Sequence, residues 1–256
     1  MLETPVSSTR PRWGLEVLVV LALSLGQSAV YSVLSLTEKL TRPEPLNQQT
    51  TSMNTSAVPD RPWLDLAYQL ANNVFLAVPV ALALYLLWVR PGRWGWSGMG
   101  LDRRHPLRDA VVGLGLAAGI GIPGLGFYLL ARELGFNTTV APANLTAAWW
   151  TVPVLVLAAF ANGLLEEVVV VGYLFGRLRE KGWSWVAVLL TSALVRGSYH
   201  LYQGFGGFAG NVLMGLILGL VFLRWRRVWP LVVAHTLLDV AAFVGYTLVA
   251  PHVDWL

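Results

Sequence analysis

Two adjacent carboxylates and two histidines are the residues of this sequence best suited to chemistry. Glu166 and Glu167 stand in the otherwise apolar run LLEEVVVVGYL, His200 follows, and His235 with Asp239 comes later in the chain. A carboxylate flanked by two histidines is a sufficient set for activating water. The carboxylate can act as a general base, or Glu166, His200 and His235 can hold a divalent metal such as zinc that activates the water.

Helix geometry limits how these side chains can meet. His235 and Asp239 are four residues apart, so they share a helix face, and the carboxylate can orient the imidazole. Glu166 and Glu167 are about 100° apart around a helix and cannot both point straight at one centre. We therefore expect Glu166 to serve the chemistry and Glu167 to support it.

The elements that must position these residues are membrane helices. Of the 256 residues, 55% are hydrophobic and only 12% are charged, which is typical of an integral membrane domain. Seven apolar segments approach the roughly 20 residues that cross a hydrocarbon core, and the fifth is short. The segments are 15–36, 64–89, 110–130, 152–174, 186–199, 208–223 and 228–249. We predict an all-α, polytopic bundle that forms one membrane domain over residues 1–256.

The basic residues orient this bundle. Most of the 18 Lys and Arg residues fall at one end of the predicted spans, and the other end holds only Lys39, Arg42, Arg61 and Arg132. The positive-inside rule then places the N-terminus inside and makes the polar segment 37–62 an exterior, mobile loop. The basic excess is explained by topology and lipid headgroups, so we expect no nucleic-acid partner. The strong preference for Arg over Lys is typical of a GC-rich bacterial genome, so we expect a bacterial plasma membrane. The oligomeric state stays open.

Polar side chains within the predicted spans are few, and all those identified lie after residue 165. Each costs about 2–3 kcal/mol or more at the bilayer centre, so such groups normally face a protein interior and mark a function. Arg196 and Asn211 join the five residues above. Asn211 lies on a small-residue stripe and needs a polar partner, which could be the site. The alternative for each residue is a purely structural hydrogen bond between helices. The absence of cysteine excludes a thiolate metal site and a cysteine nucleophile.

At these residues the sequence resembles the CPBP intramembrane proteases, a family that includes the CAAX prenyl endopeptidases and the Abi-type bacteriocin-processing proteins. The family carries Glu-Glu-x-x-x-Arg, then a motif ending in His, then His-x-x-x-Asn or a close variant. The matches are Glu166-Glu167 with Val171 where Arg is expected, the stretch from Arg196 to His200, and the stretch from His235 to Asp239. They fall within residues 150–250, which we predict to be the protease-like core.

The resemblance implies an endopeptidase that hydrolyses a peptide bond of a membrane-associated peptide or protein. Glu166, with His200, would activate the water. His235 and Asp239 would stabilise the oxyanion or help to hold a metal, and the metal-free and metal-dependent mechanisms both stay open. Asp239 replaces the commoner Asn, and an ionised carboxylate cannot donate a hydrogen bond to an oxyanion.

Val171 leaves Glu167 without the arginine of the family motif. An isolated buried carboxylate is costly, so we expect Arg196, the one basic residue within the predicted membrane region, to pair with Glu167 instead. Two other functions remain as alternatives. One is a non-catalytic membrane scaffold that lost the arginine. The other is a proton-coupled transporter, which is less favoured because the first three spans show no matching polar set and no clear inverted repeat.

Overall fold

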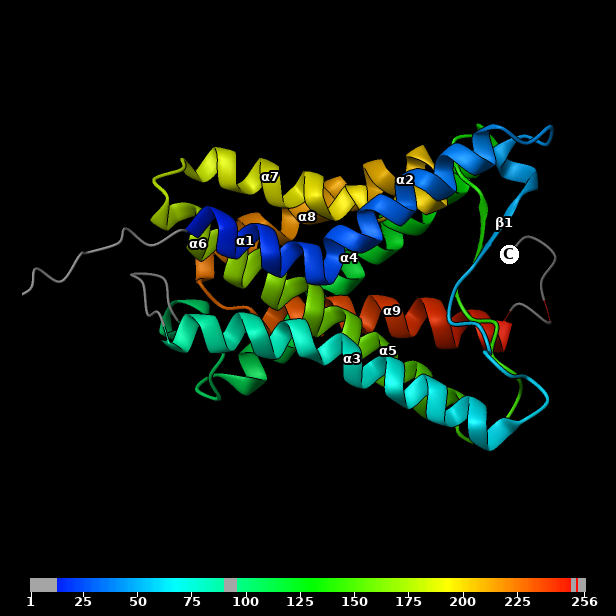
Figure 1. Ribbon diagram of the computed structural model, residues 1–256, viewed down its shortest axis with the longest axis horizontal. Helices are drawn as coiled ribbons and strands as arrows, with labels where there is room; N and C mark the ends of the chain where they lie inside the picture. The colour runs from blue at the N-terminus through cyan, green and yellow to red at the C-terminus, as the bar shows by residue number, and fades with distance from the viewer. Residues whose placement is uncertain (1–12, 90–95, 250–251, 253–256) are drawn as a thin grey trace, which may run out of the picture.

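The protein is an elongated helical bundle whose helices run roughly along one axis (Figure 1). The computed structural model describes residues 13–89, 96–249 and 252, so the predicted inner N-terminal residues 1–12 lie outside it. The α-helices are α1 (Trp13–Leu21), α2 (Gln27–Leu40), α3 (Pro62–Val89), α4 (Pro106–Glu133), α5 (Thr151–Glu166), α6 (Leu174–Glu180), α7 (Trp185–Ser198), α8 (Phe205–Trp225) and α9 (Trp229–Val249). The π-helical turns are η1 (Ala22–Gly26) and η4 (Glu167–Tyr173), and the 3₁₀ turns are η2 (Leu46–Gln48), η3 (Trp96–Met99) and η5 (Leu201–Gln203). The strands are β1 (Thr50–Ser52) and β2 (Thr139–Ala141).

The predicted all-α membrane architecture is confirmed. Within the described residues, 6 helical stretches are long and apolar enough to cross a bilayer. They are Gly14–Leu40, Pro62–Val89, Pro106–Glu133, Thr151–Glu180, Phe205–Trp225 and Trp229–Val249. The fifth predicted span corresponds to α7, which is shorter, as its short apolar run indicates. The chain is therefore a multi-pass membrane protein.

The continuous stretch α5–η4–α6 forms the centre of the bundle. In the most apolar 18-residue stretch of this element, 72% of the residues are buried. In the equivalent 18-residue stretch of α4, only 6% of the residues are buried. The helix α5 packs against α9 and α3, and α7 packs against α8. The four valines from Val168 to Val171 are fully buried. An uninterrupted apolar run of this kind suits a helix that is surrounded by protein on all sides.

The segment 37–62 is part of the packed structure, contrary to the mobile loop that its composition predicts. Its strand β1 pairs in parallel with β2, with Thr50 opposite Thr139. Lys39 is buried, and its Nζ donates to Thr51 Oγ1 at 2.8 Å and to the carbonyl of Tyr202 at 2.6 Å. The segment therefore caps one end of the bundle, next to the turn that follows α7.

Buried polar residues also occur before residue 165, which the sequence did not reveal. Asp65, Gln69 and Asn73 follow one face of α3 at four-residue spacing and are all buried. Asp65 Oδ1 accepts the backbone N–H of Ala57 at 2.7 Å, and the Gln69 amide donates to the carbonyl of Thr55 at 3.2 Å. These residues tie the segment 37–62 to α3, so their role is structural.

Candidate active site

Glu166 and Glu167 lie where α5 changes into a π-helical turn. Glu166 is the last residue of α5, and Glu167 is the first residue of η4. Such π turns appear frequently at functional sites. Glu166 is 8% exposed, and Glu167 is fully buried. Both carboxylates are thus enclosed by protein, and neither is left facing lipid.

Arg196, in the last turn of α7, joins the two carboxylates. Its Nη2 donates to Glu167 Oε1 at 2.6 Å, and its Nη1 donates to Glu166 Oε2 at 3.1 Å. The guanidinium is fully buried, so removing either partner would leave an uncompensated charge in the interior. The expected pairing of Arg196 with Glu167 is present, and it extends to Glu166.

The two carboxylates converge more closely than the 100° spacing predicts. Both contact Arg196 and both lie near the His235 ring. Glu167 Oε1 is 2.7 Å from His235 Nδ1, and Glu166 Oε2 is 3.9 Å from His235 Nε2. The two carboxylates share one cluster without pointing at one atom, because the guanidinium and the imidazole each present a different nitrogen to each carboxylate.

His235, on α9, holds its two ring nitrogens in different surroundings. A carboxylate only accepts, so the 2.7 Å contact means that Nδ1–H donates to Glu167 Oε1. Arg196 Nη1 is 3.4 Å from the same nitrogen, too long for a good hydrogen bond. His235 Nε2 faces Glu166 Oε2 at 3.9 Å and Asp239 Oδ1 at 3.8 Å. In the neutral ring, this nitrogen presents a lone pair to the space between two carboxylates.

His200 lies at the edge of this cluster, in the turn between α7 and η5. Its Nδ1 is 3.0 Å from the carbonyl oxygen of Arg196, which can only accept, so Nδ1–H is the donor. The ring is close enough to Glu166 and His235 to interact electrostatically with both. In the neutral ring, His200 Nε2 is then a proton acceptor.

Two members of the cluster were missed in the sequence. The Tyr199 hydroxyl donates to Glu166 Oε2 at 2.7 Å, and the Asn162 side chain lies close to Asp239. Asn162 stands four residues before Glu166, and this spacing on one helix face was the available signal. Tyr199 stands at the predicted end of a span, where aromatic residues are ordinary interfacial anchors. Its contact with Glu166 therefore had no sequence signal.

Two other positions singled out in the sequence lie apart from the cluster. The Asn211 amide donates to the carbonyl of Gly207 at 2.9 Å, one turn earlier on α8. The Asn211 amide thus donates within its own helix, and no hydrogen bond among the described residues joins it to the cluster. Val171 is fully buried in the hydrophobic core. The cation that the family motif would supply from position 171 is supplied here by Arg196 of α7.

A metal held by Glu166, His200 and His235 does not fit this arrangement. Among the described residues, no three His, Asp or Glu side chains are placed so that they could hold one ion. Arg196 Nη1 and the Tyr199 hydroxyl both donate to Glu166 Oε2. A guanidinium so close to the carboxylate would repel a divalent cation bound to it. We therefore assign the residues of this cluster no metal-dependent step.

The comparison with known families concerns the part of the chain that holds this cluster. Residues 148–241 match the family model described as type II CAAX prenyl endopeptidase, Rce1-like. The sequence resemblance to the CPBP proteases is confirmed over this part of the chain. The match includes the three motif stretches and Arg196, and in general terms it indicates a membrane protease of the CPBP type. No curated protein and no solved structure matches the chain.

Proposed function

We propose that this protein is an intramembrane endopeptidase that hydrolyses a peptide bond of a membrane-associated substrate with water activated by Glu166. The observation that carries the proposal is the setting of His235. Its Nδ1 is held by Glu167 at 2.7 Å, while its Nε2 faces Glu166 Oε2 across 3.9 Å. A polar gap longer than a direct hydrogen bond suits a bridging water.

The water would be held by His235 Nε2 and activated by Glu166. As the water oxygen forms a bond to the peptide carbonyl carbon, its proton passes to Glu166 as general base. The same proton then passes to the leaving nitrogen as the C–N bond breaks. A positioned general base or acid contributes about 10²–10⁴-fold to the rate.

The other residues of the cluster would support these steps. Arg196 compensates the charges of Glu166 and Glu167, which favours the ionised carboxylate that a general base needs. Glu167 fixes the tautomer and orientation of His235. Asp239 accepts but does not donate when ionised, so it would orient His235 and would not stabilise the oxyanion. The proposed partners are membrane lipid and a peptide or protein substrate, in a bacterial plasma membrane.

The proposed substrate class follows the family description, which names CAAX prenyl endopeptidases. The test is cleavage of a farnesylated peptide ending in a CAAX sequence, by purified wild-type protein and by the variants Glu166→Gln and His235→Ala. We expect both variants to lose cleavage by at least about 10²-fold while remaining folded. A proteomic comparison of membranes with wild-type protein and with Glu166→Gln would identify the natural substrate. Undiminished cleavage by folded Glu166→Gln would overturn the mechanism.

The non-catalytic scaffold is the second candidate, and it depends on Val171. Its motivation is that the arginine of the family motif is missing. Because Arg196 Nη2 already pairs with Glu167 at 2.6 Å, the structural reason for inactivity is weakened. A scaffold would cleave no peptide in either form, so the same assay distinguishes the two proposals.

A further inference from the structure

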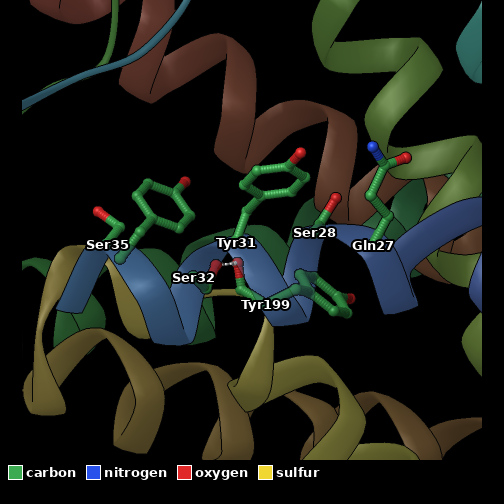
Figure 2. A pocket seen from close by; sticks show the side chains of 7 residues that line it. Gln27, Ser28, Tyr31, Ser32, Ser35 and Tyr199 are labelled. Carbon is green, nitrogen blue, oxygen red and sulfur yellow. Dashed lines mark hydrogen bonds between the residues drawn. The ribbon is translucent and has the colours of Figure 1, made fainter. Parts of the chain in front are cut away.

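An open pocket of about 390 Å³, lined by residues with polar side-chain groups, lies beside α2, next to the proposed active site (Figure 2). Gln27, Ser28, Tyr31 and Ser35 project into it from one side of α2. An α-helix turns about 100° per residue, which puts these four positions within one face about 100° wide. Tyr199 and Tyr202 also line the pocket. The volume falls in the range of sites that bind small ligands or short peptide segments.

The position of this pocket in the bilayer makes its polar lining unusual. Gln27 and Ser28 are exposed side chains near the middle of the span Gly14–Leu40. Within the part of the chain that the structure describes, no residue hydrogen-bonds to the side chains of Gln27, Ser28 or Tyr31. Lipid tails cannot satisfy such groups, and polar groups at this depth normally face a cavity or a partner. The amide and hydroxyl groups of Gln27, Ser28 and Tyr31 are therefore available to a ligand that has polar groups of its own.

Tyr199 connects the pocket with Glu166. The Ser32 hydroxyl donates to the Tyr199 carbonyl at 2.8 Å, and the Tyr199 hydroxyl donates to Glu166 Oε2 at 2.7 Å. A ligand in the pocket would thus lie one tyrosine side chain away from the proposed general base.

The chemistry of the lining selects the class of ligand. None of the seven lining residues is charged, so the pocket offers no counter-charge to a phosphate headgroup or to a carboxylate. Hydroxyls and an amide both donate and accept, which matches the N–H and C=O groups of a peptide backbone. Gln27 to Ser35 spans about 12 Å at 1.5 Å per residue. An extended chain of three to four residues, at about 3.3 Å each, has the same length.

We propose that this pocket binds the extended backbone of the substrate next to the bond that is cleaved. The inference rests on the proposed endopeptidase function and assigns the part of the protein that holds the substrate. Lipid surrounds the outer face of α2, so the pocket would provide the hydrogen bonds that a peptide backbone loses on leaving water.

The first test measures binding without cleavage. Tyr31 is replaced by the photo-crosslinking residue benzoylphenylalanine in the Glu166→Gln background, and the probe is the farnesylated CAAX peptide. The matched control carries the same replacement at Tyr85, an exposed tyrosine of α3 that does not line the pocket. We expect at least about tenfold more crosslinking at position 31, reduced by excess unprenylated peptide and unaffected by farnesol. Equal crosslinking at the two positions, or competition by farnesol alone, would overturn the proposal.

The second test separates binding from chemistry. The double variant Gln27→Leu, Ser28→Ala removes two polar side chains of the lining. Losing about two hydrogen bonds raises KM by roughly tenfold and leaves kcat unchanged. Thr37→Val is the control, because the Thr37 hydroxyl bonds to the Val33 carbonyl on its own helix, away from the pocket. An unchanged KM would remove the pocket from substrate binding.

The two tests also distinguish failure of the proposed pocket from failure of the proposed endopeptidase function. Cleavage with an unchanged KM in the double variant contradicts the pocket and leaves the endopeptidase standing. Specific crosslinking at position 31 without any cleavage by the wild-type protein supports the pocket and contradicts the endopeptidase. If the protein shows no specific crosslinking and no cleavage, both proposals are contradicted.

Discussion

Two fully buried arginines each bind two glutamates, and in the part of the chain that the structure describes, a histidine is paired only with the glutamates of Arg196. Arg196 binds Glu166 and Glu167, and a tyrosine hydroxyl donates to Glu166. Arg177, on α6, binds Glu16 Oε1 at 2.7 Å and Glu180 Oε2 at 2.9 Å.

The second cluster repeats the tyrosine of the first and adds a backbone contact. The Tyr173 hydroxyl donates to Glu16 Oε1 at 3.0 Å, and Arg177 Nη2 donates to the carbonyl of Leu86 at 2.9 Å. These bonds link α6 to α1 and α3. Together the contacts of Arg177 fasten three helices to one another.

The difference between the clusters lies in what surrounds each arginine. Beside Arg196, His235 Nε2 faces two carboxylates at 3.8–3.9 Å, and His200 stands at the edge. The bonds of Arg177 are direct contacts of 2.7–2.9 Å to carboxylates and a carbonyl. Buried ion pairs are thus common to both clusters. The basic nitrogens beside the carboxylates of Arg196 are what supports the proposal of a catalytic site there.

The largest expected contrast is between Glu166→Gln and Glu16→Gln. Each variant replaces a buried carboxylate bound to arginine by a neutral amide. Glu166→Gln should lower cleavage of the farnesylated reporter by about 10²–10⁴-fold, because it removes the general base. Glu16→Gln should lower the unfolding temperature in detergent and leave the activity of the folded fraction unchanged. If Glu16→Gln abolished activity in folded protein, the two clusters would not differ as proposed.

Removing either arginine should be strongly destabilising. Arg196→Met and Arg177→Met each leave two buried glutamates without their cation, which costs about 3–5 kcal/mol for a buried pair. The second changes Glu167→Gln and Glu16→Gln, added to the respective variants, should recover part of the loss by removing a leftover charge. Thermal unfolding in detergent measures this. Arg196→Met should be inactive both alone and with Glu167→Gln. The folded fraction of Arg177→Met should stay active both alone and with Glu16→Gln.

Restoring the arginine of the family motif should harm this protein. Val171→Arg places a guanidinium in the apolar core, where Glu167 is already paired, so we expect the free energy of unfolding to fall by about 3 kcal/mol or more. Val171→Ile is the control for size and should lower the free energy of unfolding by at most about 3 kcal/mol. A Val171→Arg, Arg196→Met variant that was both stable and active would show that position 171 can replace Arg196 after all.

The smallest expected effects come from the two tyrosines. Tyr199→Phe and Tyr173→Phe each remove one hydrogen bond to a glutamate, which we expect to cost about 1–2 kcal/mol of stability. Tyr199→Phe should also lower kcat by about tenfold, because Glu166 loses a donor that positions it. Tyr173→Phe should leave kcat unchanged. Equal kcat values in the two variants would mean that Tyr199 contributes only to stability.

Much of the fold followed from local properties of the sequence. Apolar runs of about 20 residues predict membrane spans because lipid admits no unsatisfied backbone. The partner of Glu167 followed from the scarcity of charge, because Arg196 was the one cation available within the predicted membrane region. Both inferences depend on the kinds of residues present and need no knowledge of helix packing.

Contacts between distant residues were where sequence reasoning failed. The charge pattern places Arg177 with the basic residues at the inner end of the spans, yet it is fully buried against Glu16 of α1. Asn211 was expected near the site, yet its own helix satisfies its amide. The segment 37–62 looked like a loop because its hydrogen-bond partners, near residues 139 and 202, lie far away in the chain.

The sequence alone was sufficient to establish a multi-pass helical protein with a polar cluster after residue 165, because lipid accepts long apolar runs and excludes charged groups that protein does not enclose. Which atoms meet was decided by the packing of α5, α7 and α9. That packing turns Arg196 toward both glutamates, leaves His235 Nε2 facing Glu166, and puts Tyr199 between the cluster and the pocket of α2. Spacing along one helix restricts a side chain to a face, and only the neighbouring helices determine what that face contacts.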